Sequence, residues 1–251
     1  MRPAPTDLTY AALSAYNCRH FAPNDPLYTM RWSAPLIRFS VVASSMKRSK
    51  SSRRWLDEHV NDPYVKQAQK DGLRSRSSYK LIELNEKDKL IRPGMLLMDL
   101  GSAPGGWSQV AGRLVGDKGR VVATDILPMD PLDNVDFIQG DFTEDAVFQQ
   151  LLDKLDGRQP DLIVSDIAPN LSGVAVADQA SSMYLVELTL DMVRKVLKPN
   201  GNYVVKVFQG EGSDDFLRDV RTSFEKVVVR KPAASRPRSN EVYLVAKGFK
   251  G

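Results

Sequence analysis

The sequence predicts an α/β protein built on a doubly wound, mostly parallel sheet of seven strands. Between residues 95 and 246, short apolar runs alternate regularly with helix-like segments, as expected when parallel strands are joined by crossover helices. The first apolar run, Met95–Met98, is continuous rather than alternating, which is typical of a central strand buried on both faces. It is followed by the glycine-rich turn Asp99–Trp107, which leads into a helix pattern.

The remaining elements follow in the order that a doubly wound sheet requires. β-Branched and aliphatic runs indicate the further strands, and apolar residues at helical spacing indicate the helices between them. Pro199–Gly201 ends the longest helix pattern and turns the chain into the next strand. The expected strands are 120–124, 135–139, 162–165, 203–207, 226–230 and 241–246, and the expected helices are 107–114, 144–155, 179–197 and 214–223.

The composition is that of a globular protein without membrane spans. Of the 251 residues, 42% are hydrophobic and 26% are charged. No apolar run approaches the roughly 18 residues that a membrane helix needs. The single cysteine, Cys18, excludes an internal disulfide, and two histidines are too few for the usual zinc sites. We therefore expect a cytoplasmic monomer that uses no metal.

The first 45 residues differ in character from the rest. Five prolines interrupt them without sustained periodicity, so we expect an irregular extension over residues 1–45 and the functional domain over residues 46–251. Met46 and the basic residues after it resemble the start of many bacterial reading frames, so the upstream part is interpreted as an overextended start. Its four arginines and two acidic residues leave a targeting segment as the alternative.

Positive charge is concentrated in two segments, although the formal net charge is only +4. Residues 47–80 contain ten lysines and arginines against four acidic residues, and residues 226–250 contain seven against one. Clustered cations suit RNA, because binding releases counterions from the phosphates. The first segment also contains three aromatic residues, Trp55, Tyr64 and Tyr79. Their rings could stack on unpaired RNA bases or could anchor a helix on the core. A solvated charged face is the alternative for either segment.

The glycine turn indicates a nucleoside cofactor rather than a dinucleotide. After Gly101 the next glycines are Gly105 and Gly106, which is not the G-x-G-x-x-G spacing that seats a pyrophosphate. Because glycine lacks a Cβ, the backbone can turn tightly here and let a ligand approach the strand end. The spacing favours S-adenosylmethionine and disfavours a nicotinamide-dependent oxidoreductase. An ordinary strand-to-helix turn is the alternative.

Carboxylates follow the next two strands. Asp125 comes at the end of the second strand, where an acid accepts the ribose hydroxyls of such a cofactor. Asp141 follows the third strand and is assigned to the adenine amino group. Either residue could instead cap a helix or a turn.

Charged residues also stand at the fourth and fifth strands. Asp166 follows the strand at 162–165, and Lys206 lies inside the β-branched strand at 203–207. Burying an unpaired lysine costs several kcal/mol, so Lys206 is expected to be paired or functional. Because the carboxyl ends of neighbouring parallel strands meet at one edge, we expect Asp166 and Lys206 to lie together beside the cofactor. A structural ion pair is the alternative.

Five segments have the sequence and spacing of one known family. They are Gly72–Leu81, Asp99–Trp107, Ser165–Asn170, Val204–Gly212 and Ser239–Tyr243. Through them the chain, from about Ser51 to Lys247, resembles the bacterial FtsJ (RrmJ) ribosomal RNA 2′-O-ribose methyltransferases. The resemblance implies a catalytic tetrad of Lys80, Asp166, Lys206 and Glu241, and cofactor contacts at Gly105, Trp107, Asp125, Asp141 and Asp166.

The resemblance implies methyl transfer from S-adenosylmethionine to the ribose of a uridine in the A loop of large-subunit (23S) ribosomal RNA, presented on the assembled 50S subunit. The same tetrad occurs in cap and transfer RNA ribose methylases, so a transfer RNA or mitochondrial rRNA substrate stays open, as does a ribosome-assembly protein that binds RNA without catalysis. The displacement needs alignment and a proton acceptor. We assign Lys206 as the base, Asp166 and Lys80 as positioning residues, and Glu241 as their support.

Overall fold

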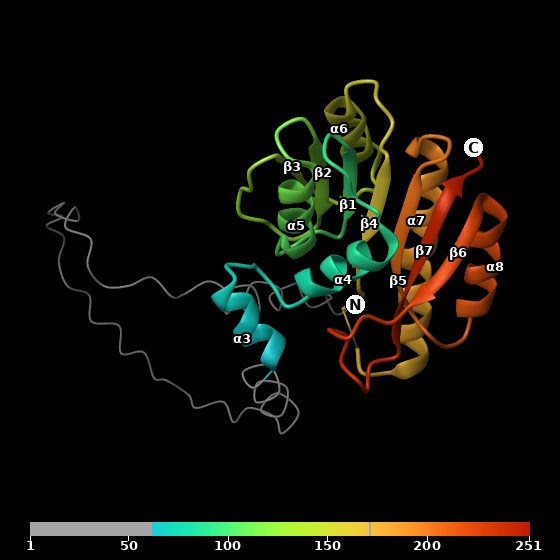
Figure 1. Cartoon of the computed structure of the whole chain (residues 1–251). Coiled ribbons are helices and arrows are strands. Elements are labelled where there is room, and N and C mark those ends of the chain that lie inside the picture. The colour runs from blue at the N-terminus through green and yellow to red at the C-terminus, as the bar shows by residue number, and fades with distance from the viewer. Residues whose placement is uncertain (1–61, 171) are drawn as a thin grey trace, which may run out of the picture. The chain divides into compact units, whose positions relative to one another are not determined.

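The structure is a computed structural model that describes residues 62–170 and 172–251. Its strands are β1 (Leu96–Leu100), β2 (Arg120–Asp125), β3 (Val135–Gln139), β4 (Leu162–Ser165), β5 (Asn202–Phe208), β6 (Phe224–Arg230) and β7 (Glu241–Phe249). They form one sheet in the order β3-β2-β1-β4-β5-β7-β6 (Figure 1). β7 is antiparallel to both of its neighbours, whereas all other pairs are parallel. The doubly wound, mostly parallel sheet that the sequence predicts is confirmed.

The described helices include two that the sequence pattern did not predict. The helices are α3 (Pro63–Lys70), α4 (Ser78–Asp88), α5 (Gly106–Val115), α6 (Asp145–Leu155), α7 (Ala175–Val196) and α8 (Ser213–Ser223). Both of the unpredicted helices, α3 and α4, lie before residue 95, where the alternation of strand-like and helix-like segments that predicted the other helices begins. β1 also extends to Leu100, two residues beyond the expected strand, so Asp99 lies inside it.

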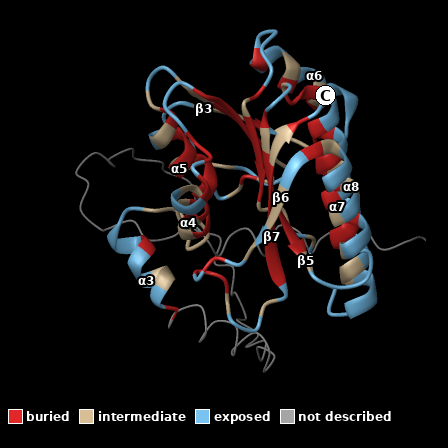
Figure 2. Ribbon diagram, turned by 45° about the vertical axis from the view of Figure 1, so that its right-hand side comes forward, coloured by how far each residue is buried: buried red, intermediate tan, exposed pale blue. Residues whose placement is uncertain are grey.

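Helices enclose the sheet on both faces. α6, α7 and α8 cover one face, where Met98 and Ile163 point, and α4 and α5 cover the other, where Leu97 and Val164 point. Successive residues of a strand point to opposite faces. The central strands are therefore buried on both sides (Figure 2), which explains why they appear in the sequence as unbroken apolar runs.

An ion pair joins the end of α4 to the edge strand β6. Arg230 donates from Nε and NH2 to the two carboxylate oxygens of Asp88, at 2.9 and 2.8 Å. The Asp88 side chain is 7% exposed, and the hydrogen bonds from Arg230 lower its pKa in spite of the burial. Lys247 adds a hydrogen bond from Nζ to the backbone carbonyl of Asp88. These contacts fix the position of α4, the helix that carries Lys80.

We expect Arg230→Ala to lower the free energy of unfolding by about 2–3 kcal/mol, because it removes the bidentate partner of a buried carboxylate. The matched control is Arg194→Ala. Arg194 pairs with Asp219 at 2.6 Å on an exposed surface, so its loss should cost less than about 1 kcal/mol. Urea unfolding followed by circular dichroism measures both variants, and equal losses would contradict the expectation.

Candidate active site

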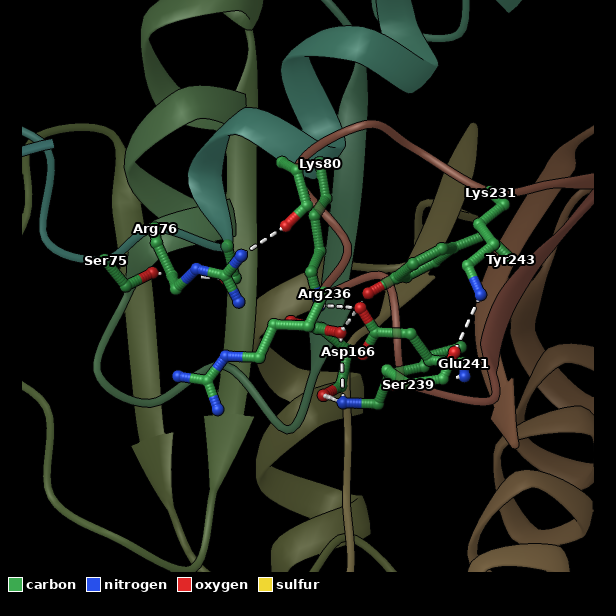
Figure 3. A network of polar contacts seen from close by, with 12 residues as sticks. Ser75, Arg76, Lys80, Asp166, Lys231, Arg236, Ser239, Glu241 and Tyr243 are labelled. Atoms are coloured by element: carbon green, nitrogen blue, oxygen red, sulfur yellow. Dashed lines mark hydrogen bonds and ion pairs between the residues drawn. The ribbon is translucent and has the colours of Figure 1, made fainter. Parts of the chain in front are cut away.

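Lysines and carboxylates from separate elements meet near the carboxyl ends of β4 and β5 (Figure 3). Asp166 follows β4, Lys206 lies in β5, and Glu241 and Tyr243 lie in β7. Lys206 is directly opposite Tyr243 in the register of β5 and β7, so Lys206, Tyr243 and Glu241 occupy one face of the sheet. α4 covers this face and brings Lys80 to it.

Lys206 and Asp166 are joined by two contacts. Lys206 Nζ donates to the backbone carbonyl oxygen of Asp166 at 2.6 Å and lies 3.0 Å from its Oδ1. The Tyr243 hydroxyl donates to the same Oδ1 at 2.7 Å. Both charged side chains are largely buried. The expected contact between Asp166 and Lys206 is confirmed.

A second buried ion pair lies beside the first. Lys80 Nζ is 2.8 Å from Glu241 Oε1, and it lies 5.4 Å from the centroid of the Tyr243 ring, within the range of a cation–π interaction. Tyr243 therefore links the two pairs, because its ring faces Lys80 and its hydroxyl binds Asp166. No role was predicted for Tyr243 from the sequence. The available signal was its alternation with Glu241 on one face of a strand.

The surrounding charges keep Asp166 ionised although it is buried. Desolvation alone would raise the pKa of Asp166, but the charges of Lys206 and Lys80 and the hydrogen bond from Tyr243 hold it below its ordinary value. Burial, reinforced by the carboxylates of Asp166 and Glu241, raises the pKa of Tyr243 well above its ordinary value. The phenol therefore stays protonated and acts as a hydrogen-bond donor to an ionised carboxylate.

The glycine turn connects β1 to α5. Gly101 and Gly105 have φ angles of 77° and 101°, which favour glycine. A Cβ at Gly101 would lie 2.8 Å from the Ile167 side chain, and one at Gly105 would lie 2.8 Å from the Arg74 guanidinium. Close packing of protein atoms at these two positions, together with the positive φ, requires glycine. The expected approach of a ligand to this turn stays a prediction.

Arg74 ties the glycine turn to the loop between β2 and β3. Its NH1 donates to the carbonyl oxygens of Pro104 and Asp130 at 3.3 and 2.7 Å, and its NH2 donates to that of Pro131 at 2.7 Å. Three backbone carbonyls thus hold the Arg74 guanidinium. This cation of the basic segment at 47–80 has a structural role.

Two aromatic residues of the same segment pack against each other. The ring centroids of Tyr64 and Tyr79 are 5.5 Å apart, and the Tyr79 hydroxyl donates to Asp71 Oδ2 at 2.6 Å. These contacts join α3 to α4 through two half-buried rings, and stacking of these rings on RNA bases stays a prediction. Trp55 lies outside the described residues.

The predicted cofactor carboxylates lie at the ends of β2 and β3. Asp125 accepts hydrogen bonds from the backbone N–H groups of Ala103 and Leu127, both at 2.8 Å, and burial raises its pKa. Asp141 is exposed and accepts from the backbone N–H and hydroxyl of Thr143, at 2.9 and 2.7 Å. Asp125 thus organises the glycine turn, and Asp141 forms a turn of its own.

The Trp107 side chain is buried between α4, α5 and the sheet, with 2% exposure. Its indole N–H donates to the Ser77 carbonyl oxygen at 2.9 Å, and its ring centroid lies 5.6 Å from that of Tyr243. The side chain therefore supports the Tyr243 ring. A predicted cofactor contact of Trp107 would have to come from its backbone.

Asp99 is a buried carboxylate to which the sequence analysis gave no function. Ser108 donates to its Oδ2 at 2.6 Å, whereas its Oδ1 has no hydrogen-bond partner among the described residues, and the same holds for the buried Ser102 Oγ. Burial raises the pKa of Asp99 to about 7; the Ser108 hydrogen bond opposes this shift, and the charges of Asp166 and Asp125 reinforce it. Two such polar atoms at the glycine turn suit a polar ligand.

Within residues 62–170 and 172–251, no group of three or more histidine, cysteine or acidic side chains is arranged to hold a metal ion. None of the helices in that part of the chain has the length and apolar character to cross a membrane.

The sheet order, with β7 antiparallel between β5 and β6, and the buried lysine–carboxylate pairs define a Rossmann-like methyltransferase. Residues 73–249 match the FtsJ-like methyltransferases. The chain belongs to this family, as the five sequence segments predict.

Relatives in several bacteria resemble nearly the whole described domain. The ribosomal RNA large subunit methyltransferase E of Stutzerimonas stutzeri is 89% identical over 206 residues, which cover 82% of this chain and 100% of that protein. The protein of the same name from Marinobacter nauticus is 68% identical over 205 residues, 82% of this chain and 99% of that protein. A crystal structure described as a ribosomal RNA methyltransferase of Plasmodium falciparum is similar with a TM-score of 0.64 and 31% identity, over 70% of this chain and 98% of that one.

Proposed function

We propose that the protein methylates the ribose 2′-hydroxyl of a uridine in large-subunit (23S) ribosomal RNA, on the 50S subunit, with S-adenosylmethionine as methyl donor. The observation that carries the proposal is the joining of the Lys206–Asp166 and Lys80–Glu241 pairs through Tyr243. The names of relatives up to 89% identical support this substrate class. We expect the protein to act as a cytoplasmic monomer.

The residues at the glycine turn fit the amino-acid part of S-adenosylmethionine. Asp99 Oδ1 and Ser102 Oγ are buried without partners among the described residues, and a carboxylate is a suitable acceptor for an ammonium group. The backbone N–H groups where α5 begins, at Gly106, favour a carboxylate. Gly105 and Trp107 would add backbone contacts at the same helix start.

The nucleoside part fits the ends of β2 and β3. Asp125 would accept hydrogen bonds from the ribose hydroxyls, and Asp141 would accept one from the adenine amino group. Asp125 is held in place by two backbone N–H groups, so its orientation is fixed before a ligand arrives. Asp166, at the end of β4, would face the methyl-bearing end of the cofactor.

The tetrad supplies alignment and a proton acceptor. When bound, S-adenosylmethionine supplies an electrophilic methyl carbon. Lys206 Nζ would accept the proton of the ribose hydroxyl, after giving up the proton that it carries in the ion pair with Asp166. Asp166 orients Lys206 Nζ through two oxygens. Lys80, held by Glu241, positions the ribose, and Tyr243 keeps both pairs in register.

The proposal is tested by transfer of labelled methyl from S-adenosylmethionine to three RNA samples. These are 50S subunits from cells that lack this protein, free ribosomal RNA from the same cells, and bulk transfer RNA. We expect label in a single uridine ribose of the subunits. Label in transfer RNA would show that the enzyme is a ribose methyltransferase whose substrate is transfer RNA. Without label in any sample, the protein would be a noncatalytic RNA binder. Equilibrium dialysis with S-adenosylmethionine and NAD tests the cofactor separately.

A further inference from the structure

Exposed apolar side chains gather on the first turns of α7. Val174, Val176 and Tyr184 are 60%, 74% and 61% exposed, and they are three of the six large hydrophobic residues that lie exposed within residues 62–170 and 172–251. Single exposed apolar residues are ordinary on protein surfaces, but a group of them on one element marks a contact surface. We call these three residues, together with the exposed Ala180 between them, the α7 patch.

The patch follows one side of the helix. Val176, Ala180 and Tyr184 are spaced four residues apart, which aligns them along α7. The contact of this helix with the core is made by other positions, among them Val186 and Leu190. The patch is therefore not needed to hold α7 on the sheet.

Acidic side chains continue and flank the patch. Glu187 is exposed one turn beyond Tyr184, and Glu211 and Asp214 are exposed where α8 begins. Gln179 Nε2 donates to the Glu211 carbonyl oxygen at 2.9 Å, which holds this segment against the start of α7. Among the described residues, none of these three carboxylates has an ion-pair partner. The surface around the patch therefore carries uncompensated negative charge.

The patch lies at the edge of the sheet that carries the active site. α7 begins after β4, and Gln179 Nε2 also donates to the Phe208 carbonyl oxygen at 3.2 Å, two residues beyond Lys206 in β5. α7 packs on the face of the sheet that α4 does not cover (Figure 1). A partner on the patch would therefore lie near the active site and leave the tetrad accessible to RNA.

We propose that the α7 patch docks on a basic and partly apolar segment of a ribosomal protein in the 50S subunit; this rests on the proposed function. Proteins that bind ribosomal RNA carry excess positive charge, because they neutralise its phosphates. Such a segment complements the charges of Glu187, Glu211 and Asp214. Tyrosine is enriched among the residues that contribute most to protein interfaces. Direct contact with RNA is disfavoured, since its phosphates would face three unpaired carboxylates.

Docking through α7 would favour the assembled subunit over free ribosomal RNA. The tetrad contacts a ribose, which both forms of the substrate offer, whereas the patch adds a contact that protein-free RNA lacks. Two contacts on one particle reinforce each other, because the first raises the effective concentration of the second.

The test is the double variant Val176→Ser/Tyr184→Ser, with affinity measured for purified, unmethylated 50S subunits and for the ribosomal RNA extracted from them. We expect roughly tenfold weaker binding to the subunits and unchanged binding to the extracted RNA. Because both side chains lie outside the core, the midpoint of thermal unfolding and the affinity for S-adenosylmethionine should change little. Glu187→Lys should weaken binding to the subunits but not to the extracted RNA, because a lysine repels a basic protein segment and attracts phosphates.

The matched control is Val229→Ser, which removes an exposed apolar side chain from β6 and should leave both affinities unchanged. An equal loss for subunits and extracted RNA in the double variant would overturn the proposal, because the patch would then contact RNA. With p-benzoylphenylalanine in place of Tyr184, irradiation with purified subunits should crosslink a ribosomal protein, and crosslinks to RNA alone would also overturn it. If the unmodified protein methylates a mapped uridine and the α7 variants bind subunits as it does, only the docking site fails. Absence of transfer by the unmodified protein refutes the proposed function instead.

Discussion

The variant Lys206→Arg is expected to lose methyl transfer while it keeps its fold and its affinity for S-adenosylmethionine. Arginine retains a positive charge beside Asp166, so the buried carboxylate is not left unpaired. However, a guanidinium group stays protonated at neutral pH and does not accept the proton of the ribose hydroxyl. General base catalysis contributes about 10²–10⁴-fold in rate, and we expect the single-turnover rate to fall by at least about 10²-fold.

Lys206→Ala separates the catalytic from the structural role of the same side chain. It removes the partner of a buried carboxylate, which typically costs about 3–5 kcal/mol, so both stability and activity should fall. The control for the arginine substitution is Lys195→Arg, at an α7 lysine that lies over the Phe148 ring and should leave the rate unchanged. Rapid-quench assays on 50S subunits measure the single-turnover rate, and calorimetry with S-adenosylmethionine measures the affinity for the cofactor. A fully active Lys206→Arg variant would show that Lys206 is not the base and serves only as the ion-pair partner of Asp166.

The strand-end part of the site follows from the sequence alone. Asp125 and Asp166 come where continuous apolar runs stop, and a parallel sheet brings such positions to one edge. Lys206 stands out because a lysine within a β-branched strand requires a partner. The contact between Asp166 and Lys206, at 3.0 Å, is therefore predictable from the expected order of β4 and β5.

The part contributed by α4 is not predictable in this way. Lys80 lies in α4, which precedes the alternation of strands and helices and is not at the end of a strand. The helix is fixed by Asp88 and Arg230, which are 142 residues apart, and local sequence carries no trace of such a contact. The link through Tyr243 likewise depends on its register with Lys206 across the antiparallel pair of β5 and β7. Long-range packing, rather than local propensity, completes the tetrad.

Asp99→Asn is expected to stabilise the cofactor-free protein at alkaline pH and to weaken cofactor binding. Burial raises the pKa of Asp99 from 3.8 to about 7. Between about pH 4 and pH 7 the folded protein therefore binds more protons than the unfolded chain, and the free energy of unfolding falls as the pH rises. Above pH 7 the buried, ionised carboxylate of Asp99 lowers the free energy of unfolding by on the order of a few kcal/mol. Asparagine carries no charge, so this cost should disappear.

Urea unfolding at pH 5 and pH 8 measures the effect, with the exposed Asp214→Asn at the start of α8 as the control. The stabilisation by Asp99→Asn should be larger at pH 8, whereas the control should show no such difference. The same substitution removes the anionic partner offered to the cofactor's ammonium group, so affinity for S-adenosylmethionine should fall by roughly 10- to 100-fold. A variant that is less stable at pH 8 and binds the cofactor normally would show that Asp99 is a structural acceptor. Opposite changes in stability and affinity would instead mean that this carboxylate is kept buried, at a cost to the free protein, for the ligand that it binds.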